Sequence, residues 1–233
     1  MIKFNNYLAL TCLPDLTASQ STSFIQKYQF WLFLLAAILV RQIPIISVPF
    51  TWLASYFHEM SHGLVALLTG GHILQIQLFT NGAGLCTSQG GSRFLISFSG
   101  YAGAIVWGSI IYLIATLKRS FARVFCGLIV LLLCCSLLLW VRDVLTFFIC
   151  VFLLGLFLIL LNNKIRSHIQ WLVQLIGMVI VLNALLSPLY LIDGRSIGDG
   201  ASLAQFTFVP EIIWVIIWSS MGVVALYLLG KKS

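Results

Sequence analysis

Residues 49–71 read PFTWLASYFHEMSHGLVALLTGG, an apolar stretch with one short polar motif near its middle. A proline at the first helical position gives up no hydrogen bond, so Pro49 can open a helix here. The Gly70–Gly71 pair is a typical stop signal. We therefore expect a helix from about Pro49 to Thr69. About 20 residues, each rising 1.5 Å, suit one crossing of a bilayer.

The composition of the whole chain is typical of a protein surrounded by lipid. Of its 233 residues, 61% are hydrophobic and only 8% are charged, whereas a soluble domain carries about a quarter charged residues. The formal charge of +7 comes from basic residues scattered near the ends of apolar stretches, not from a basic run or helix face. This pattern indicates membrane anchoring and argues against nucleic-acid binding. The six cysteines form no CxxC pair and are interpreted as packing residues.

Hydropathy predicts an all-α polytopic membrane protein with about six to seven transmembrane helices, lying as an integral protein in the lipid bilayer. Residues 1–27 are polar enough to form an N-terminal leader, and Arg41 and Pro44 keep the first span short. The expected spans are 28–40, 49–69, 94–117, 121–140, 144–161, 169–191 and 210–229.

The segment from residue 72 to 92 has a different character. Residues 73–79 partly alternate and are rich in strand formers, Asn81-Gly82 is a hairpin turn signal, and 85–88 can form the return strand. Because open strand edges cannot face lipid, this β-hairpin must lie at the membrane interface or fold back against the protein beside the second helix.

The polar motif at 58–62 is His-Glu-Met-Ser-His, an H-E-x-x-H pattern. On a helix, His58 and His62 share one face, so their imidazoles can converge on one zinc ion at about 2.0–2.1 Å. Glu59 is then placed to take a proton from an attacking water. An unpaired charge in the bilayer costs roughly 2.5–3.5 kcal/mol, and no Lys or Arg lies within two turns of Glu59. A metal and a water-filled cavity would remove that cost, which favours a functional site over three incidental polar residues.

A catalytic zinc normally has three protein ligands, so one more is needed. His72, His168 and Glu211 are more simply explained as polar loop residues and a helix N-terminal charge. Asp193 and Asp199 each precede a glycine in the loop after the sixth span. Either Asp-Gly pair alone is typical of a turn, but together they favour one of these aspartates as the third ligand.

These features resemble the site-2 protease family of intramembrane zinc metalloproteases, and most closely its small multi-span bacterial and plant branch. The similar stretches are HEMSHGLVALLTGG at 58–71, ILQIQLFTNGAG at 73–84, SGYAGAIVWG at 99–108, and the region from Asn183 to Asp199. The resemblance implies a single transmembrane peptidase-like domain over 28–233. It also implies that His58 and His62 bind Zn²⁺ and that Glu59 is the catalytic general base.

The family's third ligand is an Asp in an N-x-x-P-x-x-x-L-D-G motif, and here the chain departs from the pattern. Asn183 and Pro188 are present at a wider spacing, and two Asp-Gly pairs follow. We favour Asp199 because it looks like an Asp that opens a helix, and keep Asp193 as the alternative. The resemblance implies that Asn183 assists near the reacting carbonyl; an Asn in a span could equally serve interhelical hydrogen bonding.

The family also holds its substrate as an extended strand beside the active site. The hairpin would suit this by strand addition, and we expect Gln75 and Gln77 to contribute to substrate binding.

The leading hypothesis is an intramembrane zinc metallopeptidase that hydrolyses peptide bonds in or near transmembrane segments of other proteins. The alternative is a non-catalytic membrane protein of the same fold that binds a metal or a partner. A third hypothesis, a transporter with an intramembrane ion site, has no internal repeat to support it. Geometry discriminates among them, because a peptidase needs His58, His62 and one Asp to converge with Glu59 beside them.

Overall fold

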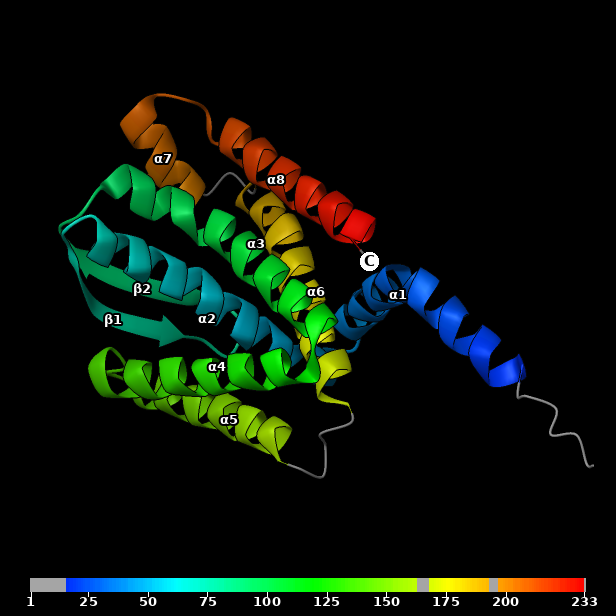
Figure 1. Ribbon diagram of the computed structural model, residues 1–233. Coiled ribbons are helices and arrows are strands. Elements are labelled where there is room, and N and C mark those ends of the chain that lie inside the picture. The colour runs from blue at the N-terminus through cyan, green and yellow to red at the C-terminus, as the bar shows by residue number, and fades with distance from the viewer. Residues whose placement is uncertain (1–15, 163–167, 193–196, 233) are drawn as a thin grey trace, which may run out of the picture.

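The computed structural model describes residues 16–162, 168–192 and 197–232, which form a helical bundle with one small β-hairpin (Figure 1). The elements in chain order are α1 (Leu16–Gln42), α2 (Pro44–Leu68), β1 (His72–Leu78), β2 (Gly84–Gln89), α3 (Arg93–Leu117), α4 (Arg119–Leu139), α5 (Val144–Leu161), α6 (Ile169–Leu186), η2 (Ser187–Leu191), α7 (Asp199–Thr207) and α8 (Glu211–Lys232).

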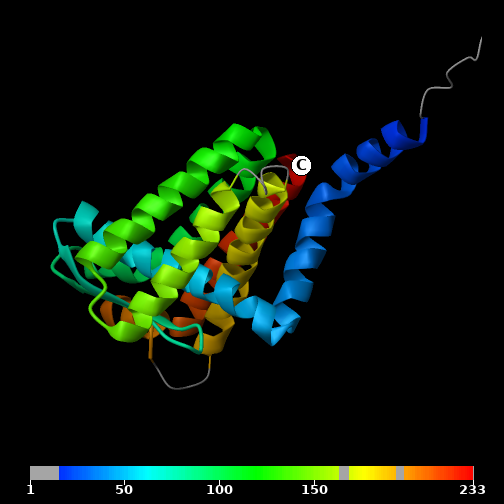
Figure 2. The ribbon, with the colours of Figure 1, turned by 90° about the horizontal axis from the view of Figure 1, so that it is seen from below.

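The predicted class, an all-α polytopic membrane protein with a hairpin after the second helix, is confirmed. Among the described residues, five helices are long and apolar enough to cross a membrane: α3, α4, α5, α6 continued by η2, and α8. The two segments expected to be the first and second spans pass that test only as a pair, Tyr28–Gln42 with Pro44–Leu68, bent by 109° (Figure 2). By length and composition, the described residues therefore hold five candidate spans, or up to six if this pair is one, which meets the lower end of the six to seven predicted.

The start of the second helix also differs from the prediction. Pro44, not Pro49, occupies the beginning of α2, and Pro49 lies inside the helix. Proline keeps a helical φ but cannot donate to the carbonyl four residues earlier. Side-chain hydroxyl groups hydrogen-bond to backbone carbonyls in these turns. Ser47 Oγ donates to Pro44 O over 2.9 Å, and Thr51 Oγ1 donates to Ser47 O over 3.0 Å. Both prolines carry the same start signal, and the earlier one begins the helix.

Two glycines bring α3 and α6 into backbone contact at the centre of the bundle. A Cβ atom added at Gly108 would lie 2.8 Å from the backbone nitrogen of Val181, and one added at Gly177 would lie 2.6 Å from the backbone nitrogen of Tyr112. Small residues permit such close crossings in membrane proteins. The α3–α6 pair supports α2 on one side, and α7 and α8 pack against α3 on the other (Figure 1).

The hairpin folds back against α2, which is one of the two positions expected for it. β1 and β2 are antiparallel, with Ile76 opposite Cys86 and Leu78 opposite Gly84. The outer edge of β1 is covered, because Ile76 N–H donates to Trp140 O over 3.0 Å and Leu78 N–H donates to Thr146 Oγ1 over 2.8 Å. The connection between α4 and α5 thus closes one edge of the sheet and leaves β2 on the side of α2.

Candidate metal centre

His58 and His62 lie on consecutive turns of α2 and face α3 across a very short gap. A Cβ atom added at Gly100 of α3 would lie 2.5 Å from both Cε1 and Nε2 of His62 and 2.6 Å from Cε1 of His58. The two imidazoles therefore rest against bare backbone. A side chain at position 100 would occupy the space that the rings need.

The side chains of His58, His62 and Asp199 converge on one point. The two Nε2 atoms are 3.1 Å apart, and Asp199 Oδ2 lies 3.1 Å from Nε2 of His58 and 3.3 Å from Nε2 of His62. Tetrahedral zinc with ligands at about 2.0–2.1 Å requires its ligand atoms to be about 3.3 Å from one another. The three atoms already have that spacing. Among the described residues they form the one group of three or more His, Cys, Asp or Glu side chains with metal-site geometry.

The two histidines are held in different ways. His62 Nδ1 lies 2.6 Å from the carbonyl oxygen of Ile96. A carbonyl only accepts, so Nδ1 carries a proton, and this hydrogen bond turns Nε2 toward the cluster. The ring of His58 packs edge-on against Tyr101, with centroids 4.4 Å apart, and Tyr101 in turn contacts Trp218 of α8 at 4.9 Å. A hydrogen bond orients one imidazole and aromatic packing orients the other.

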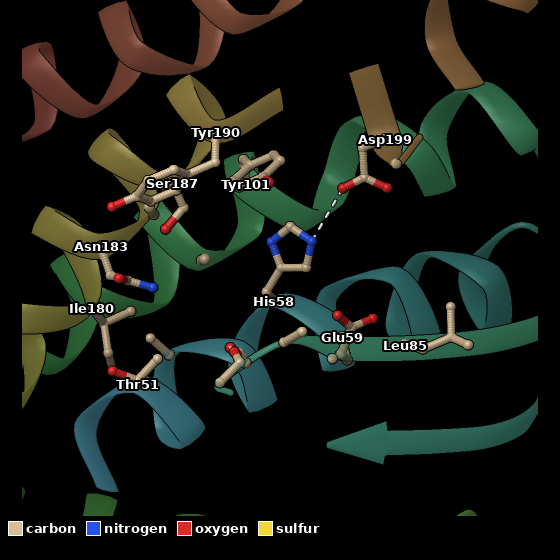
Figure 3. Close-up of a pocket in the computed structure, with 18 of the residues that line it drawn as sticks. Thr51, His58, Glu59, Leu85, Tyr101, Ile180, Asn183, Ser187, Tyr190 and Asp199 are labelled. Atoms are coloured by element: carbon tan, nitrogen blue, oxygen red, sulfur yellow. Dashed lines mark hydrogen bonds and ion pairs between the residues drawn. The ribbon is translucent and has the colours of Figure 1, made fainter. Parts of the chain in front are cut away.

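The aspartate that reaches the cluster is the first residue of α7 (Figure 3). Asp193, the alternative third ligand, lies outside the described residues. Of the other polar residues weighed as ligands, His72 lies within 3.3 Å of Gln89 on the hairpin and Glu211 begins α8. Neither belongs to the cluster.

Glu59 is buried beside the cluster, with 5% of its surface exposed. Its carboxylate accepts a hydrogen bond from the backbone N–H of Cys86. A Cβ atom added at Gly84 would lie 2.6 Å from Glu59 Oε1, so β2 passes close to the carboxylate because it has a glycine there. Figure 3 shows Glu59 on the hairpin side of α2, with His58 pointing to Asp199.

A cavity of about 730 Å³ opens onto these groups. It is lined by the junction of α1 and α2, the hairpin turn with β2, α3, α6, η2 and the start of α7. Asn183 lines it and also accepts an interhelical hydrogen bond from Arg41, which was one of the two roles weighed for it. Gln75 and Gln77 do not line it. They belong to β1, whose outer edge faces the α4–α5 connection, and it is β2 that lines the cavity.

Several lining residues were not singled out from the sequence. Tyr101 and Gly100 lie within the stretch SGYAGAIVWG that carried part of the family resemblance, and Gly84 ends the stretch ILQIQLFTNGAG. These similar stretches were therefore the available signal. Arg41 had been interpreted only as an interruption of the first span, yet it lines the cavity.

Helices apolar enough to cross a membrane, enclosing two histidines, an aspartate and a buried glutamate around one cavity, define a polytopic membrane protein with a candidate metal site in its interior. The family model of peptidase M50B-like proteins matches residues 31–229, and the chain belongs to this family. This match supports the assignment to the site-2 protease family. No curated protein and no solved structure gives a significant match.

Proposed function

We propose that this protein is a zinc metallopeptidase that hydrolyses peptide bonds in or near transmembrane segments of other membrane proteins. The observation that carries the proposal is the convergence of His58, His62 and Asp199 within 3.1–3.3 Å of one another, with Glu59 on the same helix beside them. Membership of a peptidase family supports the same conclusion.

The donor set fits zinc. Two imidazole nitrogens and one carboxylate oxygen are ligands that zinc takes in catalytic sites, where a fourth position stays open. The 3.1 Å between the two Nε2 atoms is also close to the spacing of ligand atoms around a tetrahedral zinc. When bound, zinc would polarise a carbonyl and make water more acidic.

The chain's own residues would divide the remaining work. His58, His62 and Asp199 hold the ion, and Ile96 and Tyr101 keep the two rings turned toward it. Glu59 takes a proton from the attacking water and passes it to the leaving amine. The burial of its side chain, which is 5% exposed, strengthens these charge interactions.

The edge of β2 that faces α2 and the cavity is suited to hold an unwound substrate. Residues two apart in a strand point their N–H groups to the same edge. Because Cys86 N–H points out to Glu59, Gly84 N–H points to that edge too. An extended peptide added here would run past the carboxylate. N-methylation of successive residues in a cleaved peptide should impair cleavage with a period of two. Equal effects at every position would contradict this binding mode.

Metal analysis of purified protein tests the central proposal. Wild type and Asp193→Ala should each hold about one zinc per chain, and His58→Ala and Asp199→Ala should lose it. Glu59→Gln should keep the metal but fail to cleave fluorescein-labelled casein and single-span peptides in detergent. A full metal complement in His58→Ala would overturn the site. A zinc-loaded wild type that cleaves none of these probes would favour the alternative, a binding protein of the same fold.

A further inference from the structure

Arg41 lies at the C-terminal end of α1 and makes a long-range hydrogen bond inside the cavity. Its Nη1 donates to Oδ1 of Asn183 on α6 over 2.7 Å, and both side chains line the cavity. No carboxylate among the described residues forms an ion pair with Arg41. A cation in an apolar helical region is costly to place, so its use here calls for an explanation beyond anchoring.

The chemistry of arginine decides how the Asn183 amide is turned. A guanidinium has five N–H donors and no acceptor. Only the oxygen of Asn183 can therefore face Arg41, and the amide NH₂ must point the other way. Figure 3 shows that nitrogen directed toward the part of the cavity in front of His58. A lone Asn could adopt either orientation, and the bond to Arg41 selects one.

We propose that Arg41 is a positioning residue that fixes the Asn183 amide as a hydrogen-bond donor to the substrate's carbonyl oxygen. This inference rests on the proposed peptidase function. The positive charge also draws electron density onto Oδ1 and so makes the NH₂ a stronger donor. A donor that is already oriented before the reaction stabilises negative charge on the carbonyl oxygen without reorganisation.

The proposal gives α1 a part in the reaction. The chain bends by 109° between Tyr28–Gln42 and Pro44–Leu68, and Arg41 sits immediately before that bend. The last turn of α1 is thereby tied to α6 across the cavity, between residues 142 positions apart. A shift of α1 would release the amide and switch off the donor while leaving the metal cluster intact.

Kinetics of four variants and one matched control test the proposal with casein and single-span peptides as probes. Asn183→Ala should lower kcat by about 10²–10³-fold, the usual effect of losing one such donor. Arg41→Met should lower kcat at least tenfold with little change in KM, and Arg41→Lys should restore part of it. The double variant should be no slower than Asn183→Ala alone, because Arg41 acts through Asn183. Arg119→Met, at an exposed arginine that begins α4, is the matched control and should behave as wild type. Zinc content should be unchanged in all variants.

Unchanged kcat in Arg41→Met, or effects that multiply in the double variant, would overturn the proposal. The binding affinity for a phosphinic peptide, which carries a charged oxygen in place of the carbonyl, is a second measurement and does not depend on turnover. Arg41→Met should bind it at least tenfold more weakly, with zinc affinity unchanged, and equal affinity would refute the donor role. A zinc-loaded wild type that neither cleaves the probes nor binds the phosphinic peptide would overturn the proposed function, and with it this inference.

Discussion

Replacing Gly100 by alanine adds a single methyl group at the point where α3 touches both histidines. The new Cβ would lie 2.5 Å from Nε2 of His62 and 2.6 Å from Cε1 of His58, whereas ordinary contact begins at 3.4 Å. The imidazoles must therefore retreat by about 0.9 Å, or the two helices must separate by a similar distance.

That displacement is large for a metal site. Zinc–nitrogen distances of about 2.0–2.1 Å are expected to hold within about 0.2 Å, so a shift of about 0.9 Å takes a ligand out of range. Loss of a residue that merely orients a ligand already weakens metal affinity by about 10–100-fold. We expect Gly100→Ala to weaken zinc binding by at least 100-fold. Overpacking should also lower the stability of the metal-free protein by about 1–3 kcal/mol.

Competition titration with a zinc chelator and thermal unfolding in detergent measure the two effects separately. Gly127→Ala is the matched control, because it is also a helical glycine but a Cβ there meets nothing within 4 Å. It should keep full zinc affinity and gain up to about 1 kcal/mol of stability from the better helix former. Unchanged zinc affinity in Gly100→Ala would refute the packing of the two rings against α3 or their role as ligands.

Two further substitutions separate catalysis from metal binding. Gly84→Ala places a Cβ 2.6 Å from Oε1 of Glu59 and should reduce turnover about 100-fold by moving the carboxylate. Its zinc affinity should be unchanged, and a loss of zinc would contradict a role for Glu59 outside the metal cluster. Tyr101→Leu removes the ring packed 4.4 Å from that of His58 and should weaken zinc binding about tenfold in the same titration. Tyr101→Phe keeps the ring and should bind zinc as tightly as wild type. Weak zinc binding in Tyr101→Phe would assign the orienting role to the hydroxyl instead.

Local patterns explain which parts of the fold could be predicted. The H-E-x-x-H helix follows from the 3.6-residue period, and the hairpin follows from alternation around Asn81-Gly82. Which strand of the hairpin faces the cavity depends on how the sheet packs against the helices. The sequence therefore led us to Gln75 and Gln77 on β1, although β2 lines the cavity. The 109° bend before Pro44 does not alter hydropathy, so the sequence could not show that the first two expected ranges form one bent pair.

The same distinction applies to the site. The two histidines and Glu59 are neighbours in the sequence and could be predicted together. Asp199 was favoured because it looks like an Asp that opens a helix, and spacing alone did not separate it from Asp193. Arg41 could not be predicted as a cavity residue, since its contact joins α1 to α6 and depends on the packing of the whole bundle.

The covered outer edge of β1 has a consequence for target selection. With the α4–α5 connection bonded to Ile76 and Leu78, the sheet can be extended on one side only, by main-chain groups that every peptide possesses. The main-chain pairing itself does not distinguish one side chain from another. Under the proposed function, membrane helices would also differ in the free energy needed to melt a few of their turns, which glycine and proline lower. Targets that unwind readily would then be cleaved first.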